Sequence, residues 1–282
     1  MKNFKVSLLM AVIVVFTFAA AEAKEWKEIT IATEGAFAPW NFTDSSGKLD
    51  GFEIELAADL CSRMSAKCTV VPQAWDGIIP ALQAGKYDAI MAGMSMTDKR
   101  KKVVAFSRYY AATPSLFIVL KDSPSANFST TMDRITLDDI SSDEQAALDA
   151  VGKEFKGKVI GVQNATIQEK FLQQYLGDAV DIRGYDTQEN LELDLHAGRI
   201  DAALGAMSYW VSRVNSEKGQ DMKMVGPGMT KGPFGEGVGV AVRQKDADLA
   251  ELFSKAIDAA IADGTLSKLA VKWFTFDAAA TE

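Results

Sequence analysis

An α/β fold with two similar lobes is predicted by two observations: apolar strands alternate with amphipathic helices, and one segment occurs twice. Residues 82–95 recur as residues 195–208, with seven of fourteen positions identical. Each copy has the pattern of a helix, a polar turn and a short apolar strand. We therefore expect each lobe to be a mostly parallel sheet flanked by helices.

The two copies of this repeat carry the same signals at matching positions. Gly85 and Gly198 each follow a helical pattern, and glycine commonly ends a helix because it tolerates the left-handed conformation. Asp88 and Asp201 then stand just before the apolar strand of each copy. The repeat thus predicts one helix–strand unit in each lobe.

A further strand and helix precede each copy. Residues 28–34 and 157–163 have the apolar pattern of strands. Residues 51–64 place large apolar side chains every four residues, and residues 166–175 keep three apolar side chains on one side. Both segments are predicted to be amphipathic helices.

The ends of the predicted strands indicate where a ligand would bind. Ligands of open α/β sheets bind beyond the carboxyl ends of the strands. In this chain those ends are residues 34–40, 93–100, 163–167 and 205–208. Two lobes that face each other across such ends form a cleft, the arrangement of binding proteins that close about a hinge.

Composition excludes one class of partner and bounds the domain count. The chain has 282 residues, with 30 Lys and Arg against 38 Asp and Glu, so its formal net charge is -8. A nucleic-acid partner is not expected, because binding to phosphates needs clustered positive charge. The length allows one large domain or two small ones.

The first 23 residues have the pattern of a secretory signal peptide. Lys2 and Lys5 form a basic start, residues 6–20 are almost entirely apolar, and residues 21–23 (Ala-Glu-Ala) match a cleavage site. The alternative is an N-terminal membrane anchor, but the apolar run is shorter than the roughly 20 residues that a spanning helix prefers. We expect a soluble, secreted mature protein that begins near Lys24.

Cys61 and Cys68 are the only two cysteines in the chain. In an oxidising compartment a disulfide is the expected pairing. A metal site would need more ligands, and a catalytic thiol would need a histidine partner. The one histidine, His196, is remote in sequence and occupies a helical position of the repeat.

Two charged residues at predicted strand ends are candidates for the ligand site. Arg100 follows a strand end and opens a helix, where a guanidinium can bind a carboxylate through two hydrogen bonds. The alternative interpretation is that Arg100 is solvated on a charged helix face. Glu34 ends an apolar strand and would neutralise a guanidinium or ammonium group, unless it lies at an exposed strand end.

Three aromatic residues accompany these charges. Phe37 and Trp75 would present flat faces to cations and aliphatic chains, whereas we expect Trp40 to pack in the core. No nucleophile–histidine–acid arrangement and no metal-ligand cluster can be assembled from the sequence. We therefore expect a protein that is not an enzyme and that needs no cofactor.

Several motifs resemble those of the periplasmic solute-binding proteins of polar amino acid ABC importers, known as family 3. The resemblance covers essentially the whole mature chain, including both cysteines, and its motifs are residues 51–56, 74–80, 84–90, 96–100 and 263–274. It implies a monomeric two-lobe protein that closes about a hinge and delivers its ligand to an inner-membrane ABC permease.

The resemblance also implies roles for individual residues. Binders of basic amino acids in this family use an acidic residue at the Glu34 position for the side-chain cation and an arginine at the Arg100 position for the α-carboxylate. An aromatic pair falls on Phe37 and Trp75. The aspartate that accepts the ligand's α-ammonium is replaced by Ala206 here.

This replacement favours a ligand with a substituted α-nitrogen. A buried ammonium without a counter-charge costs several kcal/mol, whereas opines such as octopine and nopaline carry a second carboxylate-bearing group on that nitrogen. Ala92 and Gly93, which replace the hydroxyl residues that usually precede Ser95, leave room for the group. The chain resembles the opine-binding branch, including an insert at 137–155. In this branch the added group would contact Gln163, Thr166 and Ser208.

These expectations define two lobes and leave alternatives for the function. Lobe 1 would comprise residues 24–112 plus 235–282 and lobe 2 residues 113–234, with crossings near Ala112 and Phe234. The alternative ligands are free arginine, lysine or ornithine. The same fold also serves periplasmic dehydratases of cyclic acids, in which Glu34 would transfer a proton, and binding proteins that signal to a receptor.

Overall fold

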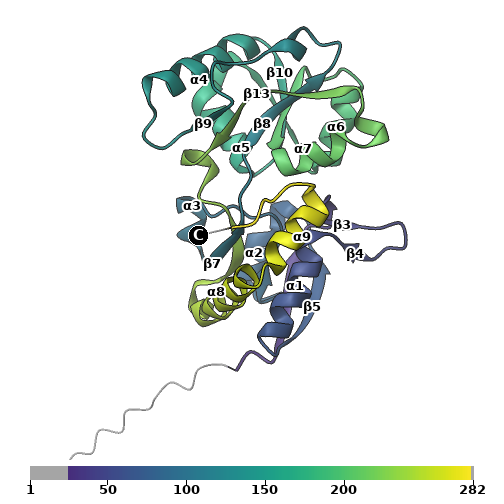
Figure 1. Cartoon of the computed structure of the whole chain (residues 1–282), viewed down its shortest axis with the longest axis vertical. Coiled ribbons are helices and arrows are strands. Elements are labelled where there is room, and N and C mark those ends of the chain that lie inside the picture. The colour runs from purple at the N-terminus through teal and green to yellow at the C-terminus, as the bar shows by residue number, and fades with distance from the viewer. Residues whose placement is uncertain (1–24, 281–282) are drawn as a thin grey trace, which may run out of the picture.

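The computed structural model describes residues 25–280, which form two lobes stacked one above the other (Figure 1). The predicted signal peptide lies outside the described residues. Within the described part of the chain, no helix combines the length and apolar character needed to cross a bilayer.

Lobe 1 is built on a five-stranded sheet with the order β5-β1-β6-β14-β7. The first three strands in this order are parallel, whereas β14 runs antiparallel to both of its neighbours. The strands are β1 (Glu28–Thr33), β5 (Lys67–Pro72), β6 (Ala89–Ile90), β7 (Val104–Ala111) and β14 (Val238–Arg243).

Helices cover both faces of this sheet, as expected for strands that are apolar on both sides. Ile29 and Ile31 of β1 pack toward the cluster formed with α1, α8 and α9, whereas Ala32 packs toward α2 on the other face. This follows from the alternation of side chains along a strand. The helices are α1 (Phe52–Arg63), α2 (Ile78–Gln83), α3 (Asp98–Lys101), α8 (Ala247–Ala262) and α9 (Thr265–Phe274).

Lobe 2 has a six-stranded sheet with the order β11-β10-β12-β8-β13-β9. Its strands are β8 (Ser115–Leu120), β9 (Arg134–Thr136), β10 (Val159–Gln163), β11 (Asp181–Tyr185), β12 (Ala202–Ala206) and β13 (Met222–Thr230). Its helices are α4 (Ser142–Phe155), α5 (Ile167–Phe171), α6 (Gln188–His196) and α7 (Met207–Val214). A small sheet of β2 (Ala36–Phe37), β3 (Asn41–Thr43) and β4 (Leu49–Asp50) projects from lobe 1.

The internal repeat is confirmed by the structure. One copy forms α2 and β6 in lobe 1, and the other forms α6 and β12 in lobe 2. The two aspartates have the same contact: Asp88 Oδ2 accepts a hydrogen bond from the Thr30 amide of β1 at 3.1 Å, and Asp201 Oδ2 accepts one from the Val159 amide of β10 at 2.7 Å. Each aspartate thus joins its strand to the neighbouring strand.

The helix expected at 166–175 has two parts. Helix α5 ends at Phe171, and a wider turn of π-helical type covers Leu172–Leu176. Phe171, Leu172 and Leu176 are all buried in the core of lobe 2.

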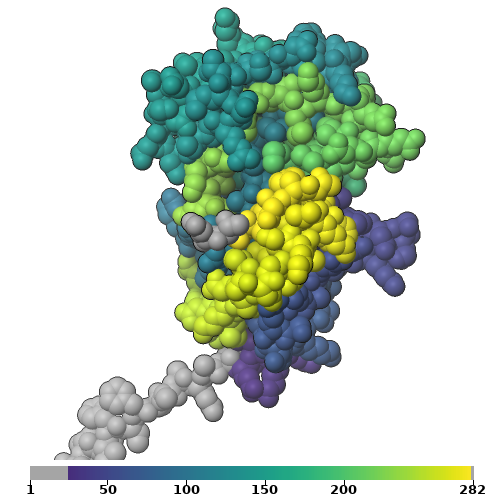
Figure 2. All heavy atoms as spheres, viewed as in Figure 1, coloured from purple at the N-terminus to yellow at the C-terminus, as the bar shows by residue number. Residues whose placement is uncertain are grey.

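The chain crosses between the lobes twice. One crossing joins the end of β7 at Ala111 to the start of β8 at Ser115, and the other joins Thr230 to Val238. The C-terminal tail supports the first crossing, because the Ala112 amide donates to Ala278 O at 3.0 Å. In Figure 2 the yellow C-terminal segment covers the junction between the lobes on the viewed face. The hinge role and the lobe limits stay predictions.

The predicted disulfide is confirmed. Cys61 near the end of α1 bonds to Cys68 in β5, with Cα atoms 6.1 Å apart. The bond closes a short loop and ties α1 to an edge strand of the lobe 1 sheet. Neither cysteine lines the cavity described below.

Replacement of both cysteines by serine should lower the free energy of unfolding by about 2–3 kcal/mol, because the unfolded chain regains the freedom of the closed loop. Chemical denaturation of the Cys61→Ser/Cys68→Ser variant and of the reduced wild-type protein measures this loss. Ligand affinity should stay unchanged, and an equal stability of oxidised and reduced protein would contradict the expectation.

Candidate ligand-binding cleft

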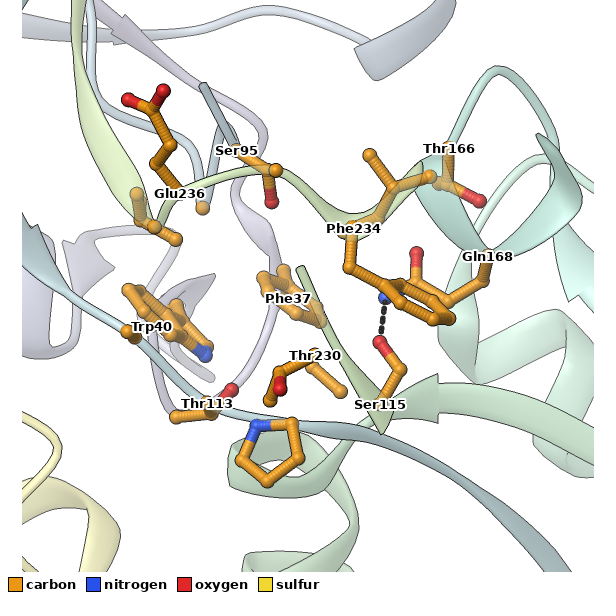
Figure 3. Close-up of a pocket in the computed structure, with 18 of the residues that line it drawn as sticks. Phe37, Trp40, Ser95, Thr113, Ser115, Thr166, Gln168, Thr230, Phe234 and Glu236 are labelled. Atoms are coloured by element: carbon orange, nitrogen blue, oxygen red, sulfur yellow. Dashed lines mark hydrogen bonds between the residues drawn. The ribbon is translucent and has the colours of Figure 1, made fainter. Parts of the chain in front are cut away.

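A cavity of about 340 Å³ lies between the lobes at the carboxyl ends of the parallel strands. Its volume falls within the range of small-molecule sites, roughly 300–1,000 Å³. Figure 3 shows part of its wall, with Phe37 and Ser95 on one side and Thr166 and Gln168 on another. The rule that ligands bind beyond strand ends thus located the cavity from the sequence.

The structure brings nine of the ten predicted ligand-binding residues into the wall of this cavity. They come from both lobes and from five separate strand ends or loops. They are Glu34, Phe37, Trp75, Ala92, Gly93, Ser95, Arg100, Gln163 and Thr166. Ala206, at the position of the missing acidic residue, also lines the wall.

Ser208 is not placed with them. Its side chain is fully buried, and its Oγ accepts a hydrogen bond from Trp40 Nε1 at 2.8 Å and lies 3.1 Å from Thr113 Oγ1. Ser208 is the second residue of α7, so the helix turns it behind the wall instead of into the cavity. Trp40 packs in the core as expected, although it also borders the cavity.

Glu34 provides a buried negative charge on the loop after β1. Its Oε1 accepts a hydrogen bond from Gln163 Nε2 at 2.7 Å, and no basic side chain among residues 25–280 forms an ion pair with it. Burial raises the pKa of Glu34 to about 7, the hydrogen bond opposes this rise, and nearby carboxylates including Glu53 and Asp76 add to it. This end of the cavity therefore favours a cation.

Arg100 provides the opposite charge at the short helix α3. Its guanidinium donates to Ser95 O at 3.0 Å and to Ala165 O at 3.3 Å, and it lies 5.1 Å from the centroid of the Trp75 ring. Burial lowers the pKa of Arg100 to about 10. Arg100 has no carboxylate partner in the described part of the chain. The two carbonyls use two of its five N–H donors, so the others remain for an anion.

Gln188 was not singled out from the sequence, yet it orients Gln163. Gln188 is 3 % exposed, and its Nε2 donates to Gln163 Oε1 at 3.3 Å. Gln163 Nε2 in turn donates to Glu34 and to Asp186 O at 3.0 Å. Gln188 lies just beyond the carboxyl end of β11, so the strand-end rule applied to that strand would have found it.

Glu53 was also missed, and it holds two loops of the cavity wall together. The side chain is 1 % exposed and accepts hydrogen bonds from the Gly93 amide at 2.7 Å, from Asn41 Nδ2 at 2.6 Å and from the Tyr110 hydroxyl. Asn41 Oδ1 accepts from the Gly35 amide at 2.7 Å. Burial raises the pKa of Glu53. The sequence did offer one signal for Glu53, because it is an acidic residue on the apolar side of the helix pattern of α1.

The lobes are closed against each other by contacts in this cleft. Glu34 of lobe 1 bonds to Gln163, the last residue of β10, and Trp75 and Arg100 bond to the two residues that follow it, with Trp75 Nε1 donating to Asn164 O at 3.1 Å. The Phe37 ring stacks on Tyr209 of lobe 2, with centroids 5.6 Å apart and planes 5° from parallel. Side chains from both lobes therefore line one site.

Two α/β lobes joined by two crossings, with a charged cleft between them, are the architecture of a two-lobe binding protein. The chain belongs to the bacterial extracellular solute-binding proteins of family 3, whose family model matches residues 29–276.

Similar proteins cover almost the full chain. The octopine-binding periplasmic protein of Rhizobium meliloti is 40 % identical over 93 % of this chain and 95 % of that protein. The L-arginine-binding protein of Pseudomonas aeruginosa is 34 % identical over 96 % and 95 %. A solved structure of a periplasmic His/Glu/Gln/Arg/opine family-binding protein from Silicibacter pomeroyi, in complex with lysine, has a TM-score of 0.71 at 32 % identity and covers 89 % of this chain and 99 % of that chain.

Membership of this family makes the chain a solute-binding protein and not an enzyme, so the dehydratase alternative is set aside. Across residues 25–280, no three His, Cys, Asp or Glu side chains gather in a way that could hold a metal ion.

The buried carboxyl of Glu34 should make ligand-free stability depend on pH. Its pKa is about 7 in the folded protein against an ordinary value of 4.5. Between these values the folded state binds more protons than the unfolded state, so stability falls as pH rises through this window. Glu34→Gln should therefore be more stable than the wild type at pH 8 by about 1–3 kcal/mol. The two should be equally stable at pH 4.

Denaturation with urea at pH 4, 6 and 8 measures this difference. The matched control is Glu217→Gln, which changes an exposed carboxylate away from the cavity and should follow the wild type throughout. If Glu34→Gln is less stable than the wild type at pH 8, the ionised Glu34 carboxylate has favourable partners in the folded protein and the expectation is wrong.

Proposed function

We propose that the protein is the periplasmic ligand-binding component of an ABC importer and captures an opine, an N-substituted arginine of the octopine or nopaline type. The observation that carries this proposal is that Glu34 and Arg100, two side chains of opposite charge in the cavity wall, are not ion-paired within the described residues. A ligand with a cation at one end and a carboxylate at the other would neutralise both.

The geometry supports a specific orientation of such a ligand. Its guanidinium would bind Glu34, where neighbouring carboxylates add negative potential. Its α-carboxylate would bind the remaining donors of Arg100. Phe37 and Trp75 line the same cavity and would contact the aliphatic chain between the two charges.

Small residues favour a substituted α-nitrogen over free arginine. Ala206 offers no carboxylate to an α-ammonium, and Ala92 and Gly93 keep the adjacent wall short. A side chain at Gly93 is excluded, because its φ is +61° and an added Cβ would lie 2.9 Å from Phe37 Cε1. The similarity to a protein named octopine-binding supports the same ligand class.

The rest of the assignment depends on the similar proteins and on the N-terminal sequence. Relatives named octopine-binding and histidine-binding are described as periplasmic, and residues 1–23 have the pattern of a signal peptide. The protein would act as a monomer and deliver its ligand to an inner-membrane ABC permease.

Free arginine, lysine or ornithine is the second candidate ligand. It is favoured by the similarity to proteins named L-arginine-binding and lysine/arginine/ornithine-binding. Both candidates share the guanidinium or ammonium group at Glu34 and the carboxylate at Arg100, so they differ only at the α-nitrogen.

A thermal-shift panel of octopine, nopaline, arginine, lysine and ornithine separates the two candidates. A ligand at a hundredfold excess over its Kd adds about 2.7 kcal/mol of stability. Octopine or nopaline should raise Tm more than arginine does at equal concentration. If free arginine raises Tm as much as both opines do, the ligand is an ordinary basic amino acid.

Arg100→Gln should reduce the affinity for every ligand of the panel by at least about a hundredfold, because a buried carboxylate loses its charge partner. Isothermal titration calorimetry measures the loss. The control Lys102→Gln removes an exposed positive charge two residues away and should bind normally. If Arg100→Gln binds these ligands with wild-type affinity, Arg100 does not contact the ligand.

The raised pKa of Glu34 adds a pH dependence to binding. A cationic group binds the ionised carboxylate, so affinity should rise about tenfold per pH unit up to pH 7 and level off above it. Calorimetry with arginine between pH 5 and 8.5 gives the profile. Glu34→Gln should abolish the profile, and a flat wild-type profile would contradict the assignment of Glu34 to the cation.

A further inference from the structure

The cavity continues past the Arg100 region into the space between the two chain crossings. We call this part the hinge end; it is bordered by Thr113, Ser115, Arg134, Thr230 and Lys231. Figure 3 shows Thr113 and Ser115 on one crossing and Phe234 and Glu236 on the other, with the cavity between them. None of the hinge-end residues was among the predicted site residues.

Two basic side chains line the hinge end. Neither Arg134 nor Lys231 forms an ion pair with any residue that the structure describes. The acidic residue that also borders this part of the cavity, Glu236, pairs with Lys101 at 2.7 Å. Asp138 is close to Lys231 in the fold, but its Oδ1 accepts a hydrogen bond from the Gly232 amide at 2.7 Å. The hinge end therefore presents two basic side chains without an ion-pair partner, opposite in sign to the end at Glu34.

Arg134 is brought here by strand pairing. It is the first residue of β9 and lies opposite Gly228 of β13. A Cβ at Gly228 would lie 3.1 Å from Pro114 Cβ and 3.7 Å from Arg134 Cγ, so the stem of Arg134 and the first crossing lie on either side of this glycine. The second crossing begins three residues after Gly228.

Lys231 occupies a backbone position that suits glycine. Its φ is +63° and its ψ is -168°, a region that non-glycine residues rarely adopt. The turn is held by a hydrogen bond from the Phe234 amide to Lys231 O at 2.9 Å. A lysine at this position costs conformational energy that glycine would not, which points to a use for its side chain.

Buried polar groups complete the wall. Ser115 is 2 % exposed and Gln168 is 7 % exposed, and Gln168 Nε2 donates to Ser115 Oγ at 2.9 Å, as the dashed line in Figure 3 shows. The Ser115 hydroxyl accepts this bond and donates to no residue in the range 25–280. Its proton is therefore available to an acceptor in the cavity.

We propose that the hinge end is an anion subsite that binds the second carboxylate of a dicarboxylic ligand. This inference rests on the proposed function, in which the guanidinium and the α-carboxylate of the ligand bind Glu34 and Arg100. The group on the α-nitrogen then extends toward the crossings, with Arg134 and Lys231 as the countercharges and Ser115 as a neutral donor. Ser208, which the resemblance to the opine-binding branch assigned to this group, lies behind the wall.

The subsite separates ligands by charge. Octopine carries one carboxylate more than arginine, so only octopine gains from the hinge end. Because Arg134 and Lys231 are both exposed residues, salt screens the gain in affinity. The preference for octopine over arginine should therefore shrink between 20 and 500 mM NaCl.

Lys231→Gly provides the sharpest test, because it restores a favourable backbone residue while it removes the charge. Its Tm should equal or exceed that of the wild type. Its affinity for octopine, measured by calorimetry at low salt, should fall about three- to tenfold, with the affinity for arginine unchanged. Arg134→Gln should show the same selective loss.

The control Arg183→Gln removes an exposed arginine of β11 that does not line the cavity, and it should bind both ligands like the wild type.

The outcomes distinguish this inference from the proposed function. If the wild type prefers octopine and both hinge-end variants keep that preference, the anion subsite is overturned and the opine assignment stands. If either variant loses octopine and arginine affinity equally, the residue acts on the fold or on closure and the subsite is also overturned. If the wild type does not prefer an opine, the proposed function fails and the subsite fails with it.

Discussion

Two opposite charges lie in one cavity, and each is held by neutral groups instead of by the other. Gln163 Nε2 holds Glu34, whereas two backbone carbonyls and the face of Trp75 hold Arg100. Neutral partners orient a charge without cancelling it, so both side chains stay in position and both keep electrostatic energy that a ligand can use. A direct ion pair between them would have to break before any ligand could bind.

Recognition and closure use the same contacts. Three lobe 1 side chains meet three consecutive residues of lobe 2, Gln163 to Ala165. Ala165 adopts a φ of +57°, and its amide donates to Glu169 Oε2 at 2.8 Å, so this short segment has a defined shape. Because the segment contacts both the cation end and the anion end of the cavity, a ligand that alters either end also alters the fit of the lobes.

Much of the fold, and the positions of Glu34, Phe37, Trp75 and Arg100 in the cavity wall, followed from local patterns. The other lining residues that were predicted came from the resemblance to the family. The repeat predicted corresponding helix–strand units, and the position of Glu34 and Arg100 after strands predicted their meeting in the cleft. The resemblance to the opine-binding branch assigned Ser208 to the ligand, but resemblance does not define where a side chain points, and the second residue of α7 lies behind the cavity wall here. Glu53 and Gln188 act through side-chain hydrogen bonds between distant segments, and no local pattern encodes such partners. Arg134 reaches the cleft only because β9 pairs with β13, more than ninety residues later in the chain.

The order of strands in lobe 1 has a consequence for how the protein forms. Strand β14 lies between β6 and β7, although lobe 2 separates it from both in sequence. Lobe 2 is one continuous segment and can collapse by itself, whereas the lobe 1 sheet has a gap until residues 238–243 arrive. Closing so long a loop is entropically slow. We therefore expect lobe 2 to fold first, and the cleft to exist only after the last strand of lobe 1 enters its sheet.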